Sequence, residues 1–590
     1  MNSPHRVSCA SIVVAAAALT AIPQLPALAQ PDLPSRVPLT FNHYYNYPEI
    51  ESALKQLHNA YPDLLMLRSI GKSVEGRDLW LMTINNRETG SDRDKPAIYI
   101  DANIHGNEVQ GAETAIYTIW YLTKSYGKVE KLTKLMDERA FYILPSVNPD
   151  GRAHWFDNPN SHSSSRTGKK PVDSDHDGLY DEDGPDDLDG DGSITSMWKA
   201  DPNGRWRRSN KDPRIFERVG PDEKGDYTNL GSEGIDNDGD GDVNEDGPGG
   251  YDMNRNWPSD WQPEHIQFGA GEYPLSFPET RAVAEFILDH PNIAAVQAYH
   301  NSGGMILRGP GKQYRESEYP REDIAVYDEI GRTGEQMLPF YRYMIIHKDL
   351  YDVHGGFVNW TAEGLGIFSF TNEQWSNDQY VNVKEEGRNT ERRFKFGDLL
   401  QFGQAYTPLK PYDHPIYGEV LIGGWTKYSE RVAPTFLLEE MCHRNAAFTL
   451  YHADQIPKLS FSRVDVADLG QGVWSVTAEV KNDGAIPTIS GVARNRKIGA
   501  VDRANLAAGP GAANITVLTS GTLADRYRAP LDLTERQPER IPHAAGIPGH
   551  GFRLFRWIVQ GSGSVVLTYQ SQKGGKIERT VDLAATQTAP

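Results

Sequence analysis

A histidine and a glutamate three residues apart, His105 and Glu108 in the stretch IHGNEVQ, stand where an apolar run stops and a helical pattern begins. Imidazole nitrogens and carboxylate oxygens both bind Zn²⁺, and a catalytic zinc site needs three protein ligands and one open position. A third ligand must therefore come from elsewhere, and His300, which ends the apolar run AAVQAYH, is the best candidate. Because an H-x-x-E pair alone arises easily by chance, the alternative is a loop histidine followed by an acid that a helix N-terminus favours.

These residues need a scaffold that brings distant strand ends together. Strand-like runs alternate with helical patterns, which predicts an α/β fold with a mixed or parallel sheet flanked by helices. The expected strands span residues 97–101, 140–144, 294–300 and 367–373, with two more around a glycine turn within 64–86, and the expected helices span 37–61, 109–126 and 280–288. Ligands of such sheets bind beyond the carboxyl ends of the strands. His105 follows a strand at that end, and His300 and Glu373 each end one.

A stretch rich in Asp and Gly, residues 152–250, interrupts this alternation. DSDHDGLYDEDGP from residue 173 and DNDGDGDVNEDGP from residue 236 agree at eight of thirteen positions, and a partial copy starts at Asp187. Asp at positions 1, 3 and 5 with Gly at 6 is typical of a loop around one Ca²⁺, although an acidic loop can also be a solvated turn. Closely spaced carboxylates repel one another without a cation. We therefore expect two or three structural Ca²⁺ ions, with ligands in two groups, Asp173, Asp175, Asp177 and Asp181, and Asp236, Asp238, Asp240 and Asn244.

Both ends of the chain differ from the middle in their pattern of apolar and polar residues. From about Leu459 onward, alternating segments such as VWSVTAEVKN, separated by Gly, Pro and Asn, predict an all-β sandwich. At the other end, His5 and Arg6 precede an apolar run and the small-residue pattern Ala-Leu-Ala, which predicts a signal peptide. The expected domains are a signal peptide (1–29), a main domain with its insertion (30–458) and a β-sandwich (459–590).

The composition favours an exported protein without disulfides. No later segment holds the roughly 18 apolar residues that cross a bilayer, and Cys442 is the one cysteine outside the expected signal peptide. The formal net charge is −20 for the full chain and −21 once Arg6 is removed with the signal, which argues against nucleic-acid binding. We therefore expect secretion or release into the periplasm, and the oligomeric state stays open.

Several motifs in a fixed order then point to a family. Besides HGNE, they are NPDG at residues 148–151, YDMNRNWP at 251–258 and YDVHGGFVNWTAEGLGIFSFTNE at 351–373. Over roughly residues 44–375 the chain resembles the zinc metallocarboxypeptidases of the carboxypeptidase A superfamily, and the Gly-Asn form of HGNE is closer to the carboxypeptidase N/E branch. The resemblance implies one catalytic Zn²⁺ held by His105, Glu108 and His300, with Glu373 as the base that deprotonates the attacking water.

The same resemblance implies how a free peptide C-terminus is bound. Arg255 resembles the arginine that grips the terminal carboxylate through two hydrogen bonds, a task to which Arg is better suited than Lys. Asn254 and Tyr351 resemble its helpers, which close over the terminal residue. Val358 takes the place that lines the pocket for the terminal side chain. An apolar residue there argues against selection of Lys or Arg, whereas the N/E branch prefers basic ends.

The arginine that polarises the scissile carbonyl in this family is harder to place. It should follow NPDG, but the acidic insertion breaks the motif spacing at that point. Arg166 in SSSRTGKKP is preferred, and Arg207 and Arg208 in GRWRRSN are its rivals.

The expected function is that of an exported zinc metallocarboxypeptidase that removes residues from peptide or protein C-termini, without an inhibitory pro-segment. One alternative keeps this chemistry and directs it to peptidoglycan stem peptides, which fits the Ala-rich signal. A second alternative is a calcium-dependent binding or adhesion protein with a silent peptidase-like domain. The presence of the full set of expected zinc ligands together with Glu373 and Arg255 argues against it, since a silent site is free to lose them.

Overall fold

The computed structural model describes residues 33–163, 171, 173, 176–245, 251–381, 389–526 and 530–583. The expected signal peptide lies outside the described residues, and so do Arg166 and Asp175 among the expected site residues. Residues 35–590 group into one unit. A search of the described residues for a helix long and apolar enough to cross a membrane finds none.

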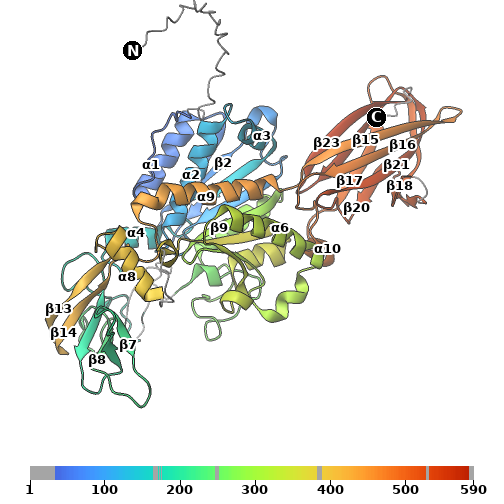
Figure 1. The fold of residues 1–590 in the computed structure, drawn as a ribbon. Coiled ribbons are helices and arrows are strands. Elements are labelled where there is room, and N and C mark those ends of the chain that lie inside the picture. Colours follow the sequence, from blue (N-terminus) through green and yellow to red (C-terminus); the bar gives the residue numbers. More distant parts are fainter. Residues whose placement is uncertain are drawn as a thin grey trace, which may run out of the picture. The chain divides into compact units, whose positions relative to one another are not determined.

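A mixed sheet of eight strands forms the centre of the main domain (Figure 1). Its strands are β1 (Leu65–Lys72), β2 (Asp78–Ile84), β3 (Ala97–Ala102), β4 (Ala140–Leu144), β9 (Ile293–Asn301), β10 (Met305–Arg308), β11 (Arg342–Ile345) and β12 (Phe368–Gln374), in the order β1-β2-β4-β3-β9-β12-β10-β11. The four central strands β4, β3, β9 and β12 are parallel, and their apolar sequences suit strands that are buried on both faces. The sheet confirms the expected fold class.

Helices cover both faces of this sheet. One face carries α1 (Tyr47–Ala60), α2 (Gln110–Ser125), α6 (Arg321–Met337) and α9 (Thr435–Asp454), and the other carries α5 (Pro278–Asp289) and the short α7 (Phe357–Asn359). Successive strand residues point to opposite faces, so Ile98 and Ile100 join the first core and Tyr99 joins the second. Helices α3 (Glu130–Glu138), α4 (Pro149–Asp157) and α8 (Asn389–Leu400) complete the domain.

Helix α1 begins at Tyr47, so the expected start at residue 37 is wrong. The side chain of Asn46 accepts the N–H of Glu49 at 3.0 Å, while the Glu49 carboxylate accepts the N–H of Asn46 at 2.8 Å. This reciprocal cap, followed by Pro48 in the first turn, fixes the helix start. The tyrosine-rich residues before it are apolar without being helical.

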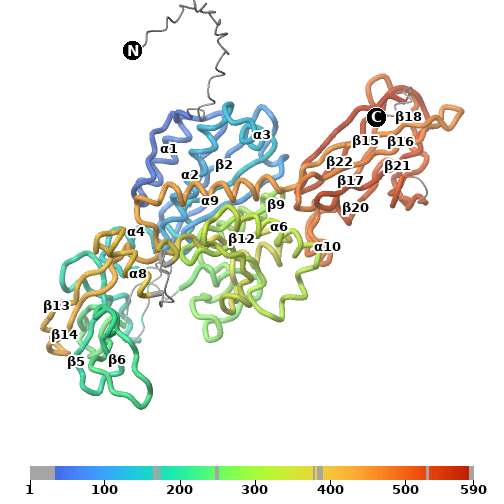
Figure 2. The backbone as a smooth tube through the Cα atoms, in the orientation of Figure 1, coloured from blue at the N-terminus to red at the C-terminus, as the bar shows by residue number. Residues whose placement is uncertain are grey.

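The insertion contributes to a second, six-stranded antiparallel sheet that the sequence analysis did not anticipate. Its strands are β5 (Ser196–Ala200), β6 (Trp206–Arg208), β7 (Phe216–Arg218), β8 (Tyr227–Ser232), β13 (Tyr406–His414) and β14 (Gly418–Trp425), in the order β13-β14-β5-β8-β6-β7. Figure 2 follows the gold hairpin of β13 and β14 beside the green strands of the insertion. The insertion is therefore joined through backbone hydrogen bonds to a hairpin that comes more than two hundred residues after β5 in the chain.

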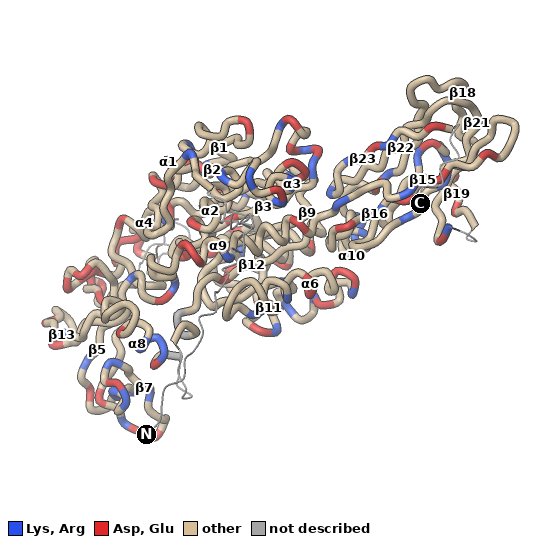
Figure 3. The backbone as a smooth tube through the Cα atoms, turned by 45° about the horizontal axis from the view of Figure 1, so that its top comes forward, with Lys and Arg blue, Asp and Glu red and all other residues tan. Residues whose placement is uncertain are grey.

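The connections of this second sheet carry the acidic repeats. Figure 3 shows acidic residues, in red, gathered beside β13. The Thr407 hydroxyl donates to Asp191 Oδ2 at 2.5 Å, and Lys410 Nζ lies 3.8 Å from Asp189 Oδ2. The loop of the partial copy thus packs against the hairpin that follows it in sequence.

The C-terminal region forms two further sheets around one apolar core. The first contains β15 (Leu459–Gly470), β16 (Val473–Asn482), β21 (Gly551–Ser562), β18 (Ala513–Leu523) and β19 (Asp532–Leu533), and the second contains β20 (Arg540–His543), β17 (Asp502–Ala508), β22 (Ser564–Ser571) and β23 (Gly575–Asp582). Buried residues from both sheets, among them Val480, Trp557 and Leu567, form a single cluster. This confirms the expected β-sandwich, to which the structure adds the short helix α10 (Gly491–Arg496).

Cys442 lies buried in α9 and is unpaired among the described residues. Burial raises the pKa of its thiol well above the usual value. A neutral, buried thiol is a packing group and a poor nucleophile.

Candidate metal centre and substrate site

The turn between β3 and α2 is shaped by Asn103. This residue follows β3 with a left-handed backbone, φ 57°, a conformation that asparagine tolerates better than most residues. Its side-chain amide donates to the carbonyl oxygens of His105 at 2.8 Å and Gly106 at 3.1 Å. These bonds fix the loop so that His105 and Glu108 face the same point before α2 begins.

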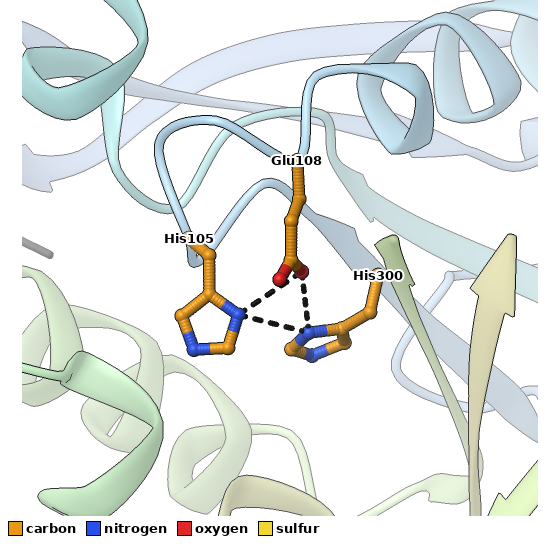
Figure 4. A group of neighbouring side chains, drawn as sticks. All are labelled: His105, Glu108 and His300. Carbon is orange, nitrogen blue, oxygen red and sulfur yellow. Dashed lines mark hydrogen bonds and ion pairs between the residues drawn. The ribbon is translucent and has the colours of Figure 1, made fainter. Parts of the chain in front are cut away.

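His105, Glu108 and His300 come together at the carboxyl ends of β3 and β9 (Figure 4). Glu108 Oε2 lies 3.0 Å from Nδ1 of His105 and 2.9 Å from Nδ1 of His300, and the two Nδ1 atoms are 3.2 Å apart. All three side chains are buried. The structure therefore assembles the three residues that the sequence singled out as metal ligands.

This arrangement fits Zn²⁺. Zinc bonds of about 2.0–2.2 Å in a tetrahedral site place neighbouring ligand atoms roughly 3.3–3.6 Å apart, slightly wider than the 2.9–3.2 Å separations observed. Nε2 of His105 lies 2.9 Å from Asp252 Oδ1, which assigns the ring proton to Nε2 and leaves a lone pair on Nδ1. That lone pair faces a carboxylate oxygen at 3.0 Å, an arrangement that a cation between the two atoms makes favourable.

Asp252 supports this centre, and the sequence analysis did not single it out. Its Oδ1 also accepts the backbone N–H of Asn254 at 2.8 Å, and its Oδ2 lies 3.8 Å from Nη1 of Arg255. A carboxylate behind a metal-binding histidine fixes the orientation of the ring and raises its basicity. Asp252 therefore connects the metal centre to the expected substrate anchor. The available sequence signal was that a metal-binding histidine such as His105 needs a carboxylate or carbonyl partner for its second ring nitrogen.

Glu373 lies in β12 directly beside His300. The two residues are register partners in the parallel pair β9 and β12, and Glu373 also partners Met305 in antiparallel β10. Register partners in a sheet project their side chains from the same face. The half-buried Glu373 carboxylate therefore projects from the same face as the His300 imidazole.

The expected substrate-binding residues also lie near one another. Arg255 is buried, and its Nη2 lies 3.5 Å from the hydroxyl of the half-exposed Tyr351. Asn254 Oδ1 accepts the N–H of Phe357 at 2.9 Å, which ties the Arg255 segment to the start of α7. The next residue of α7, Val358, is buried.

The arginine that would polarise a scissile carbonyl remains a prediction, because Arg166 lies outside the described residues. Its rivals Arg207 and Arg208 lie on β6 in the second sheet. Arg207 pairs with Glu223 at 3.2 Å, and the Arg208 guanidinium lies over the rings of Phe216 and Tyr227 at 5.5 and 5.4 Å.

The acidic loops share one turn geometry in all three copies. In each copy the N–H of the glycine at position 6 donates to the first aspartate: Gly178 to Asp173 at 3.3 Å, Gly192 to Asp187 at 2.8 Å and Gly241 to Asp236 at 3.1 Å. Two compact groups of carboxylates result, each with oxygen atoms within 4.8 Å of one another, namely Asp187, Asp189 and Asp191, and Asp236, Asp238 and Asp240. The partial third copy is therefore built like the second.

The first and second copies also meet. Asp183, just after the expected ligands of the first copy, lies in one group with Asp238 and Glu245 of the second. Asn244 uses its backbone N–H to donate to Asp183 Oδ2 at 3.1 Å. Asp181, an expected ligand, is exposed and belongs to none of the carboxylate groups found among the described residues.

Comparison with known families finds two matches along the chain. The zinc carboxypeptidase family matches residues 50–388, and a domain of unknown function matches residues 458–582. The first match covers more than half of the chain. It also contains every residue expected to bind zinc or substrate.

Curated relatives match over shorter segments. Mouse carboxypeptidase D is 34% identical over 131 residues, which is 21% of this chain and 10% of the relative. Mouse carboxypeptidase M is 37% identical over 108 residues (18% and 24%), and the zinc carboxypeptidase of Saccharothrix mutabilis subsp. capreolus is 32% identical over 114 residues (19% and 26%). The chain thus spans between 10% and 26% of the length of these relatives. Among solved structures, thrombin activatable fibrinolysis inhibitor aligns with a TM-score of 0.42 and 18% identity, over 70% of this chain and 74% of that one.

Proposed function

We propose that the chain, which belongs to the zinc carboxypeptidase family, is a zinc-dependent metallocarboxypeptidase that hydrolyses the C-terminal peptide bond of peptides and proteins. The observation that carries the proposal is the convergence of two imidazole nitrogens and one carboxylate oxygen within 3.2 Å at the carboxyl ends of β3 and β9. His105, Glu108 and His300 would hold the metal. When bound, Zn²⁺ acts as a Lewis acid that activates water and polarises the scissile carbonyl.

Glu373 is the proposed general base. Its place beside His300 in the sheet suits a carboxylate that takes a proton from the attacking water and returns it to the departing amine. Because Glu373 would serve first as the base and then as the acid, the proposed reaction requires no second acid. His105 would keep its orientation during the reaction because Asp252 holds its Nε2.

Recognition of the substrate C-terminus is assigned to Arg255, Asn254 and Tyr351. Arg255 is buried, and its ion pair with Asp252 is long at 3.8 Å, which favours a guanidinium that can still bind a substrate carboxylate through two hydrogen bonds. The Tyr351 ring is half-exposed beside it and suits a group that covers the terminal residue. Val358 lines the side-chain pocket in this proposal, and Arg166 polarises the scissile carbonyl.

The acidic insertion is proposed to bind two or three structural Ca²⁺ ions. Three of the eight expected ligands, Asp236, Asp238 and Asp240, form one compact carboxylate group, and the third copy forms another. The contact between Asp183 and the second copy suggests that ions would join the copies to each other. Export through the signal peptide would expose these loops to the high calcium concentration that weak extracellular sites require.

The test is metal analysis of the purified protein paired with mass spectrometry of a peptide library after digestion. We expect one zinc per chain and the release of single C-terminal residues. Purified peptidoglycan, digested in parallel, separates the cell-wall alternative. A protein that binds calcium but releases no residue from either substrate would favour the adhesion alternative and refute the enzyme.

A further inference from the structure

Arg431 reaches the metal centre from outside the family match. It lies in the segment 426–434 between β14 and α9, more than forty residues beyond the end of the match at residue 388. Its Nη1 lies 3.5 Å from Glu108 Oε1 and donates to the carbonyl oxygen of Asn301 at 3.1 Å. Because Asn301 directly follows His300, one guanidinium contacts both segments that carry the proposed metal ligands.

The two carboxylate oxygens of Glu108 have different surroundings. Oε2 faces both histidine Nδ1 atoms and accepts the N–H of Asn301 at 3.2 Å. Oε1 faces Arg431 instead. The carboxylate is buried, so its orientation depends on these contacts and not on solvent.

The segment that carries Arg431 is held firmly against the main domain. Ala433 donates its N–H to Gln110 Oε1 at 3.0 Å, and its carbonyl accepts the Tyr44 hydroxyl at 2.5 Å. On the other side of Arg431, Glu430 pairs with Arg393 at 2.7 Å. These bonds involve protein groups alone and fix the chain on both sides of Arg431, which is what an outer residue of a metal site requires.

We propose that Arg431 is a positioning residue of the metal centre. By holding Oε1, it leaves Oε2 as the single oxygen of Glu108 that binds the metal, and by bonding Asn301 it fixes the position of His300 relative to Glu108. The inference rests on the proposed zinc site, and it adds to that site a residue supplied by the chain beyond the family segment.

The test measures zinc affinity directly. Metal-free wild type, Arg431→Gln and Arg431→Lys are titrated with zinc against a chromophoric chelator, and thermal unfolding of each metal-free protein is recorded. We expect Arg431→Gln to raise the zinc Kd by about tenfold, with part of the loss restored in Arg431→Lys because the charge is kept. Arg393→Gln is the matched control, since Arg393 binds the same segment through Glu430 without contacting a proposed ligand.

The outcomes separate this inference from the proposed function. If wild type binds no zinc, the proposed function itself fails. If wild type binds zinc and Arg431→Gln stays within twofold of its Kd, Arg431 has no positioning role. An equal loss of zinc affinity in Arg393→Gln would assign the effect to the segment as a whole, and would overturn the proposal as well. Equal unfolding temperatures of the metal-free variants, with a higher Kd for Arg431→Gln alone, support it.

Discussion

Replacing Asp252 by alanine is expected to weaken zinc binding by about tenfold to a hundredfold. The magnitude follows from the 2.9 Å hydrogen bond between His105 Nε2 and Asp252 Oδ1. Both side chains are buried, and a hydrogen bond to a charged group contributes about 1.5–3 kcal/mol. Since each 1.4 kcal/mol changes an equilibrium constant about tenfold, loss of this bond corresponds to one or two orders of magnitude in Kd.

The assay is zinc titration of metal-free protein in competition with a chromophoric chelator. Asp260→Ala is the matched control, because Asp260 Oδ2 lies 2.8 Å from Nδ1 of His354, a pair of the same types away from the proposed ligands. The reasoning is refuted if Asp252→Ala binds zinc within threefold of wild type, or if Asp260→Ala loses as much affinity. Because Asp252 also pairs with Arg255, a higher KM for peptide substrates should accompany the change.

Three further predictions address the base, a buried acid and the acidic loops. Glu373→Gln should lower turnover at least a hundredfold with zinc still bound, and turnover within tenfold of wild type contradicts the assignment. Burial raises the pKa of Glu279 to about 7 at the start of α5. The stability that the neutral Glu279 side chain contributes is therefore present below about pH 4 and lost as the pH rises through 7. Because glutamine stays neutral, the free energy of unfolding of Glu279→Gln in urea should rise by about 3 kcal/mol relative to wild type between pH 5 and pH 8. If the free energy of unfolding depends on pH equally in both proteins, this prediction is wrong. Withdrawal of calcium with zinc kept saturating should lower the melting temperature by several degrees, and an unchanged value counts against calcium in the loops.

Six of the eight strands of the central sheet were predictable because they carry their own local pattern, whereas the short strands β10 and β11 were not expected. The apolar runs at 97–101, 140–144, 294–300 and 367–373 all became strands of one sheet. The second sheet was not predictable in the same way, since nothing local in β5 specifies pairing with β14, more than two hundred residues away. Strand pairing depends on tertiary contacts that single-sequence periodicity does not record.

The candidate site likewise contains residues that the sequence could predict and residues that it could not. His105 and Glu108 stand three residues apart and His300 ends an apolar run, so residue type and position relative to the strands made these three candidates. The role of Glu373 came from the motifs that resemble the family. Asp252 lies 147 residues from His105 in the sequence, and its role depends on a contact that only the fold creates. Arg431 likewise has no motif around it, and the sequence alone could not have connected it to Glu108.

Helix α9 lies beyond the family match, yet its side chains Leu438, Cys442 and Phe448 belong to the same core as Phe370 of β12. A fragment trimmed to residues 50–388 would leave that part of the sheet uncovered and β5 without its partner β14. The smallest recombinant piece that can fold therefore extends at least to the end of α9 at Asp454. Proteolytic trimming that removes part of α9 should therefore yield insoluble material, even though the remaining fragment keeps all the catalytic motifs.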